Sequence, residues 1–279
     1  MFLFLVFIIG IGYFFSLYYG NPVILIVAVI FSLLMNFFSY WYSDKLVLSM
    51  YKAKEVARDE MPGLWNITEN LAITAGIPMP KLYVIPESQP NAFATGRNKE
   101  HASIAVTSGI LEVLDRTELE GVIAHEMGHI TNKDILLQTV IVVLVGMVAI
   151  ASDLFWRTTL YGGRGDDSKN KNGVILAIGL VLMILSPIVA TIIQLAISRK
   201  REFLADATGA LLTRYPEGLA SALEKISASP TDMKRANHST AHLFISSPFN
   251  SKKQKISMMT KLFMTHPPVE ERIAKLRGI

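Results

Sequence analysis

Three stretches of the chain contain no charged side chain: 1–43, 135–152 and 172–198. They lower the charged fraction of the 279-residue chain to 18%, whereas the remaining residues are charged about as densely as an ordinary soluble domain. A bilayer is crossed by roughly 20 apolar helical residues. The sequence therefore predicts a soluble domain interleaved with membrane helices. It excludes a fully water-soluble protein, a disordered chain and a collagen-like fibre.

The uncharged stretches predict four membrane helices arranged as two hairpins. Residues 1–43 hold two apolar runs separated by the turn sequence Gly20-Asn21-Pro22. An uncleaved anchor is favoured over a cleaved signal peptide, because no basic residue precedes the first run. Residues 135–198 hold the second pair. Its first run, 135–152, is short, so a tilted span, a shallow re-entrant hairpin and a buried pair of core helices all stay open.

The hairpins divide one soluble domain into two parts, 44–134 and 199–279. Basic residues begin both parts, and the positive-inside rule then predicts that both face the cytoplasm. The loop 157–172 is also basic, which weakens this orientation, but an even number of crossings keeps the two parts on one side. The basic surplus of 199–279 suits anionic lipid headgroups. Nucleic-acid binding is not predicted, because no stacking or groove-reading motif accompanies these charges.

The soluble parts have the patterns of an α+β domain, with helices and a small sheet that do not alternate. Thr117-Glu118-Leu119-Glu120 matches a capping box that opens a helix, and this helix is expected to continue into the third apolar run. Apolar spacing predicts further helices at 44–58, 61–75 (ended by Gly76), 199–212, 216–227 and 268–277, and strands at 81–85, 91–95 and 103–107.

His125-Glu126-Met127-Gly128-His129 matches the pattern H-E-x-x-H on a predicted helix. Because positions i and i+4 share a helix face, both imidazoles can bind one Zn²⁺, and Glu126 can deprotonate the attacking water. The alternative is a structural histidine pair. The chain has no cysteine, which excludes disulfides and cysteine zinc ligands.

A third ligand is expected from Glu202, which lies four residues before Asp206 on a second predicted helix. Glu202 would complete a catalytic site of two histidines and one glutamate, and Asp206 would hydrogen-bond a ligand imidazole. A solvated acidic helix face is the alternative. His238 and His242 also have i, i+4 spacing and form a rival pair.

Together these motifs resemble the HtpX group of membrane zinc metallopeptidases, which are related to prenyl-protein-processing proteases. The resemblance rests on HEMGH followed by Asn132-Lys133-Asp134, on REFLADA at 201–207 and on THPPVEERIAKL at 265–276. It implies a zincin-like peptidase of the bacterial cytoplasmic membrane that cleaves misfolded or damaged membrane proteins. It also implies one zinc ion per chain, with ligands at His125, His129 and Glu202 and the catalytic base at Glu126.

The same resemblance gives roles to residues that spacing alone does not distinguish. His266 and Arg272 resemble residues that lie over the zinc, where they could stabilise the oxyanion, although His266-Pro267-Pro268 by itself is only a helix-start signal. Asn91 and Ala92 are similar to the edge strand that pairs with substrate main chain in thermolysin-like peptidases. An ordinary strand and turn is the alternative there.

The expected function is therefore that of a zinc endopeptidase, with an oligomeric state that the sequence does not predict. His129 precedes the apolar run at Ile135 by six residues, about 9 Å of helix, so the site is expected near the membrane surface. An intramembrane protease is rejected because Arg116, Glu118 and Glu120 precede the motif. A non-catalytic membrane scaffold or assembly factor with a vestigial metal site is the alternative, and the intact Glu126 argues against it.

Overall fold

The computed structural model describes residues 2–138, 199–230, 233–234, 243–246, 248 and 267–278. These residues fall into two compact units, one containing the chain up to Ser43 and the other containing the described residues from Asp44 onward.

The first unit contains two helices joined by a tight turn. Gly20 adopts a left-handed conformation (φ 62°), and the Asn21 side chain accepts a hydrogen bond from the Val23 backbone N–H at 3.0 Å. The helices are α1 (Phe2–Tyr19) and α2 (Val23–Met50). Among the residues that the structure describes, α2 alone is long and apolar enough to cross a membrane, judged by length and composition. The predicted second hairpin lies almost entirely outside the described residues, so four membrane helices stay a prediction.

The predicted helix at 44–58 is wrong beyond Met50, because α2 continues to that residue and then stops. Lys52 takes a left-handed conformation (φ 52°), and the chain turns into a short strand at Lys54–Glu55. Tyr51, at this turn, is fully buried against the rings of Phe93 and Phe244. The aromatic contacts therefore fix where the helix ends, which helical periodicity did not reveal.

A four-stranded mixed sheet forms one side of the second unit. Its spatial order is β1-β2-β4-β3, with β2 parallel to β4 and the other neighbours antiparallel. The strands are β1 (Lys54–Glu55), β2 (Lys81–Ile85), β3 (Ala92–Gly96) and β4 (Ala102–Thr107), which confirms the three predicted strands. Every residue of β3 is buried even though β3 lies at the edge of the sheet, so other elements must cover both its faces.

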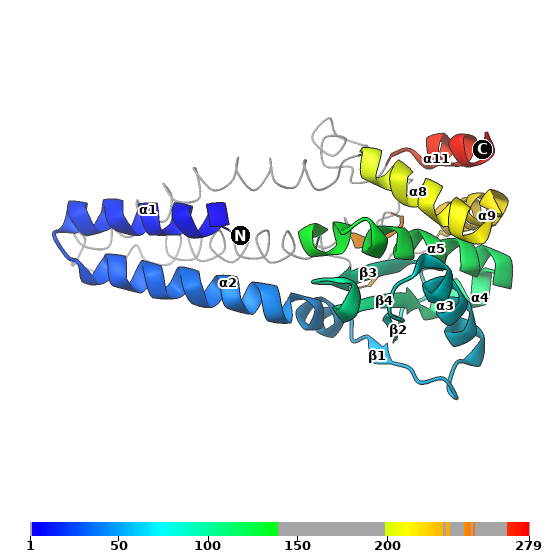
Figure 1. The fold of residues 1–279 in the computed structure, drawn as a ribbon, viewed down its shortest axis with the longest axis horizontal. Coiled ribbons are helices and arrows are strands. Elements are labelled where there is room, and N and C mark those ends of the chain that lie inside the picture. Colours follow the sequence, from blue (N-terminus) through cyan, green and yellow to red (C-terminus); the bar gives the residue numbers. More distant parts are fainter. Residues whose placement is uncertain are drawn as a thin grey trace. The chain divides into compact units, whose positions relative to one another are not determined.

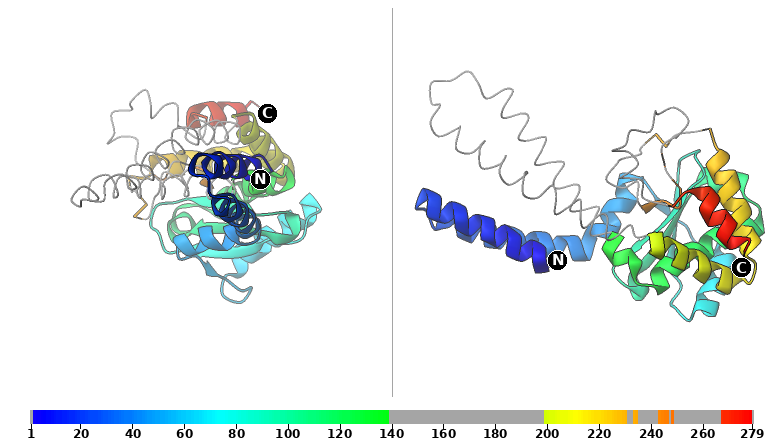
Figure 2. Two further views of the ribbon diagram at one scale, coloured as in Figure 1. Left: turned by 90° about the vertical axis from the view of Figure 1, so that its left-hand side faces the viewer. Right: turned by 90° about the horizontal axis from the view of Figure 1, so that it is seen from above.

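Helix α5 is the centre of the second unit and lies between the sheet and the helices α8 and α9 (Figure 1). Twelve of its 16 residues are buried, as expected of a helix covered on all sides. Helix α11 packs on α9 and α8 (Figure 2). The helices are α3 (Pro62–Ala75), α4 (Ser108–Val113), α5 (Arg116–Thr131), α8 (Arg199–Thr213), α9 (Pro216–Ala228) and α11 (Val269–Leu276), with a 3₁₀ turn at Lys99–His101.

Both ends of α5 differ from the prediction. The capping residue is Asp115, not Thr117: its carboxylate accepts from the Glu118 N–H, and Glu118 accepts from the Asp115 N–H. Thr117 instead donates its hydroxyl to Asp115 at 2.7 Å. The helix also does not continue into the third apolar run. It ends at Thr131, Lys133 adopts a left-handed conformation (φ 63°), and helical structure resumes only at Asp134.

Glycines let the backbones of α5 and α8 approach closely. A Cβ atom on Gly209 of α8 would lie 3.0 Å from the His125 N and 3.2 Å from its Cα. A Cβ atom on Gly128 of α5 would lie 3.0 Å from the Ala205 carbonyl oxygen. Both contacts are with backbone atoms, which cannot turn aside as a side chain can. The absence of side chains at these two positions therefore sets the separation of the helices.

Replacing Gly209 by Ala is expected to destabilise the domain by about 1–2 kcal/mol. Overpacking costs about 1–3 kcal/mol, and the better helix propensity of alanine offsets up to about 1 kcal/mol of that cost. Thermal unfolding of the detergent-solubilised protein measures the change. Gly63→Ala is the matched control, because a Cβ atom at Gly63 of α3 meets nothing within 4 Å. Equal stability of Gly209→Ala and wild type would contradict the close contact.

Candidate active site and metal centre

Helices α5 and α8 together form a cluster of three potential metal ligands. His125 and His129 lie one turn apart on α5, with ring centroids separated by 4.8 Å and ring planes at 87°. Glu202 of α8 faces them, its carboxylate oxygens lying 4.0 Å from the His125 Nε2 and 3.6 Å from the His129 Nε2. All three side chains are buried, and one ligand atom from each lies within 4.8 Å of the others. The residues that the sequence assigned to zinc are thus brought together.

Each imidazole is also bonded through its other nitrogen to a carboxylate. The His125 Nδ1 lies 2.9 Å from Asp206, and the His129 Nδ1 lies 3.2 Å from Asp134. A proton held at Nδ1 by a carboxylate leaves the lone pair on Nε2, which is the atom directed at Glu202. Asp206 was predicted for this contact, whereas the role of Asp134 was not.

The donor set suits zinc. Two imidazole nitrogens and one carboxylate oxygen form the protein ligands of many catalytic zinc sites, with a fourth position left for water or substrate. Tetrahedral ligands at roughly 2.1 Å from zinc lie about 3.4 Å apart. The observed separations of 3.6 and 4.0 Å from Glu202 are therefore about 0.2 and 0.6 Å longer than in such a site.

The electrostatic field of the cluster favours a cation. Burial lowers the pKa of His125 to about 4, so its imidazole is neutral, as ligation requires. Burial also lowers the pKa of His129, but the hydrogen bond to Asp134 and the negative charge of Glu202 outweigh it and raise that pKa to about 9. Metal binding at the His129 Nε2 must therefore displace a proton, and the carboxylate charges that hold this proton also attract a metal ion.

Glu126 lies beside the cluster and is only 1% exposed. One oxygen of its carboxylate accepts a hydrogen bond from the backbone N–H of Ala94 in β3, while the buried Oε1 has no partner among the described residues. Burial raises the pKa of Glu126 to about 7, and the charge of Glu202 adds to the rise. A carboxyl group with a pKa near neutrality and a vacant buried acceptor can take up and release a proton at working pH.

Arg272 reaches the same cluster from α11 and is fully buried. Its guanidinium donates to both carboxylate oxygens of Asp206, at 2.9 and 2.6 Å, and to the Ile245 carbonyl at 3.0 Å. Burial raises the pKa of Asp206, but the charge of Arg272 outweighs it and holds that pKa well below its usual range. His266, His238 and His242 lie outside the described residues.

The start of β3 is bonded to another segment of the same chain. The Asn91 side chain donates to the Ser246 carbonyl at 3.0 Å, and the Ala92 carbonyl accepts from the Ile245 N–H at 3.0 Å. The groups predicted to bind substrate main chain are therefore paired within the protein. Further along β3, Ala94 bonds to Glu126, which ties this edge strand directly to the site.

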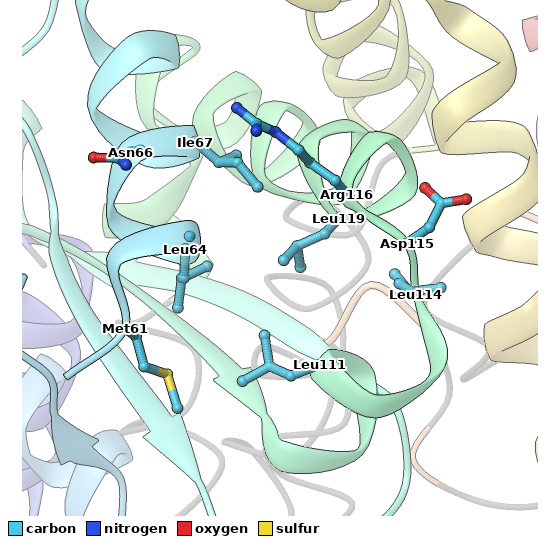
Figure 3. Close-up of a pocket in the computed structure, with 10 residues that line it drawn as sticks. Met61, Leu64, Asn66, Ile67, Leu111, Leu114, Asp115, Arg116 and Leu119 are labelled. Atoms are coloured by element: carbon cyan, nitrogen blue, oxygen red, sulfur yellow. The ribbon is translucent and has the colours of Figure 1, made fainter.

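A separate hollow of about 330 Å³ lies between α3, α4 and the start of α5 (Figure 3). Its lining is mostly apolar, with Leu64, Ile67 and Leu111 directed into it and Asp115 and Arg116 at its edge. Leu119, the lining residue nearest to His125 along α5, precedes it by six residues, or about 9 Å. The hollow therefore contributes nothing to the metal cluster.

Comparison with known proteins agrees with this geometry. Residues 59–279 match "Peptidase family M48". The chain belongs to peptidase family M48. The protease HtpX homolog of Caldanaerobacter subterraneus subsp. tengcongensis is 46% identical over 282 residues, covering 99% of this chain and 92% of that protein. The protease HtpX homolog of Pyrococcus furiosus is 47% identical over 274 residues, covering 98% and 91%. The predicted resemblance to the HtpX group is thus confirmed.

The M48 assignment is also reflected in the fold. The crystal structure of S. mikatae Ste24p is similar with a TM-score of 0.52 and 18% identity, and the match covers 89% of this chain but 57% of that one. This likeness supports the mixed helix-and-sheet architecture.

Removing Glu202 tests the ligand set. We expect Glu202→Ala to lose bound zinc, measured as metal content after gel filtration, because two imidazoles alone leave the ion under-coordinated. His238→Ala should keep its zinc. Glu112→Ala, which removes an exposed carboxylate from α4, serves as the control for loss of charge. Zinc retained in Glu202→Ala and lost in His238→Ala would overturn the assignment.

Proposed function

We propose that this M48 zinc metalloprotease is an integral-membrane endopeptidase that hydrolyses misfolded or damaged membrane proteins in quality control. The observation that carries the proposal is the convergence of both Nε2 atoms on Glu202. Beside them lies the Oε1 of buried Glu126, which has no hydrogen-bond partner in the part of the chain that the structure describes. The names of the HtpX relatives support proteolysis. A scaffold with a vestigial site is less well supported, because it has no use for a buried carboxylate oxygen that lacks a hydrogen-bond partner among the described residues.

In the proposed mechanism, His125, His129 and Glu202 hold the metal and Glu126 moves the proton. Zinc, when bound, polarises the scissile carbonyl and lowers the pKa of water. Glu126 takes the proton of the attacking water on Oε1 and passes it to the leaving amine. The Ala94 N–H fixes the other oxygen of that carboxylate, so Oε1 keeps its direction during the transfer. Burial excludes bulk water and strengthens each of these interactions.

The remaining predicted residues take different roles in this proposal. The contacts of Arg272 support a positioning role, since its guanidinium binds Asp206 and Asp206 orients His125. His266 keeps the proposed role of stabilising the oxyanion, which rests on resemblance alone. Asn91 and Ala92 keep the proposed role of pairing with substrate main chain, and a substrate would have to exchange with their bonds to Ile245 and Ser246.

Glu126→Gln tests the proposed function. The amide keeps the shape of the side chain but cannot accept the proton, so cleavage of an unfolded membrane protein should fall by at least about 10²-fold. Zinc content should stay unchanged, and a chelator should stop the wild-type reaction. Glu112→Gln is the matched control at an exposed site. Equal cleavage by Glu126→Gln and wild type would favour the scaffold.

We further propose that the catalytic unit faces the cytoplasm of a multi-pass protein. Support comes from the apolar α2 and from the basic residues that follow it in sequence. Because the chain has no cysteine, single cysteines report topology without background. Glu112→Cys should react with an impermeant thiol reagent only in inside-out vesicles. Asn21→Cys, in the α1–α2 turn, should react in right-side-out vesicles, and the reverse pattern would overturn the orientation.

A further inference from the structure

Each ligand imidazole is bonded to a carboxylate, and each of these carboxylates is bonded to an arginine. Asp206 and Arg272 support His125, as described above. On the other imidazole, Asp134 Oδ2 lies 3.2 Å from the His129 Nδ1, and Asp134 Oδ1 accepts from Arg201 Nη1 at 2.6 Å. Asp134 and Arg201, which support His129, have no role in the proposed mechanism.

The local backbone brings Asp134 back to His129. An extended helix would carry Asp134 onward, but α5 stops at Thr131, and the Lys133 N–H bonds to the Ile130 carbonyl at 3.2 Å. Lys133 then adopts the left-handed conformation, which is unfavourable for a residue with a Cβ atom. After this break in the helix, Asp134 is only 3% exposed and its carboxylate lies against the imidazole. Unfavourable backbone at such a point is retained where the surrounding contacts require it.

Arg201 binds Asp134 although the segment 135–200 separates the two residues in the sequence. It lies in the first turn of α8, directly before the ligand Glu202, and its side chain is 37% exposed. Asp134 immediately precedes the uncharged stretch 135–152, and two residues separate Arg201 from the end of the uncharged stretch 172–198. The ion pair therefore joins the two ends of the segment 135–200 at the point where the zinc ligands meet.

We propose that Asp134 and Arg201 are a positioning pair for the metal centre. Asp134 orients the His129 ring, and Arg201 holds Asp134 while fixing the first turn of α8 that carries Glu202. A buried carboxylate without its cation would be costly, so each member depends on the other. This inference rests on the proposed metalloprotease function. A plain structural salt bridge would join the same chain ends without acting on the metal, and the two roles can be separated by experiment.

The test measures zinc affinity of the purified full-length protein by competition with a chelator, together with the absorption spectrum of the Co²⁺-substituted protein. Asp134→Asn should lower zinc affinity by about 10–100-fold, the usual effect of losing a carboxylate behind a ligand histidine. It should also change the cobalt spectrum, which reports ligand geometry. Arg201→Gln should lower the affinity less, by up to about tenfold, because Asp134 stays in place.

A charge swap and a matched control separate positioning from simple bridging. Arg199→Gln removes an exposed charge from the same helical turn and should leave both measurements unchanged. Asp134→Arg combined with Arg201→Asp restores an ion pair but presents a guanidinium to His129, so zinc affinity should stay as low as in Asp134→Asn. Recovery of affinity in the swap would overturn the proposal and leave a structural bridge.

Two further outcomes distinguish this inference from the proposed function. Wild-type affinity and an unchanged cobalt spectrum in Asp134→Asn would overturn the positioning role while leaving the metalloprotease intact. Failure of the wild-type protein to bind zinc would overturn both. If Asp134→Asn does not fold, Arg201→Gln and Arg201→Lys decide: the first should weaken zinc binding and the second should restore it, and equal affinity in both would count against the pair.

Discussion

The close contact between α5 and α8 is the constraint on which the metal centre depends. The two histidines and Glu202 come from different helices, separated by more than 70 residues of sequence. Their ligand atoms reach one another only because Gly128 and Gly209 let the backbones meet. The sheet and α9 then hold α5 from its other sides, so the fold serves mainly to fix one helix pair.

The contact between α5 and α8 brings together buried carboxylates, each of which would cost free energy if it were buried alone. Glu126, Glu202, Asp206 and Asp134 are all buried within one cluster, and a buried carboxylate is tolerated only when cations or hydrogen bonds compensate it. Arg272 balances Asp206, and Arg201 balances Asp134. Arg272 also lies 3.9 Å from Glu202, but its direct hydrogen bonds go to both oxygens of Asp206. The arginines thus hold the two carboxylates that orient the imidazoles.

The sequence could predict the parts of this arrangement that depend on local spacing. The i, i+4 pairs on α5 and α8, the strands β2, β3 and β4, and the C-cap of α3 at Gly76 follow directly from periodicity and turn chemistry. The end of α2, the Asp115 cap and the Asp134 contact could not be found this way. Each depends on a contact or a backbone conformation that the local pattern does not show: Tyr51 packs on distant rings, Asp115 caps the helix in place of Thr117, and Lys133 interrupts the helix before Asp134.

The two imidazoles are therefore supported by different regions of the chain. His125 depends on the C-terminal helix α11 through Arg272. His129 depends on the residues at the two ends of the segment 135–200 through Asp134 and Arg201. Because Ile245 also bonds to Arg272 and to β3, the C-terminal support extends to the strand that holds Glu126. A complete site therefore requires that the C-terminal segment contacts the cluster through Arg272. It also requires that the Asp134–Arg201 ion pair joins the two ends of the segment 135–200. An unfinished or partly unfolded chain would then lack an ordered metal centre.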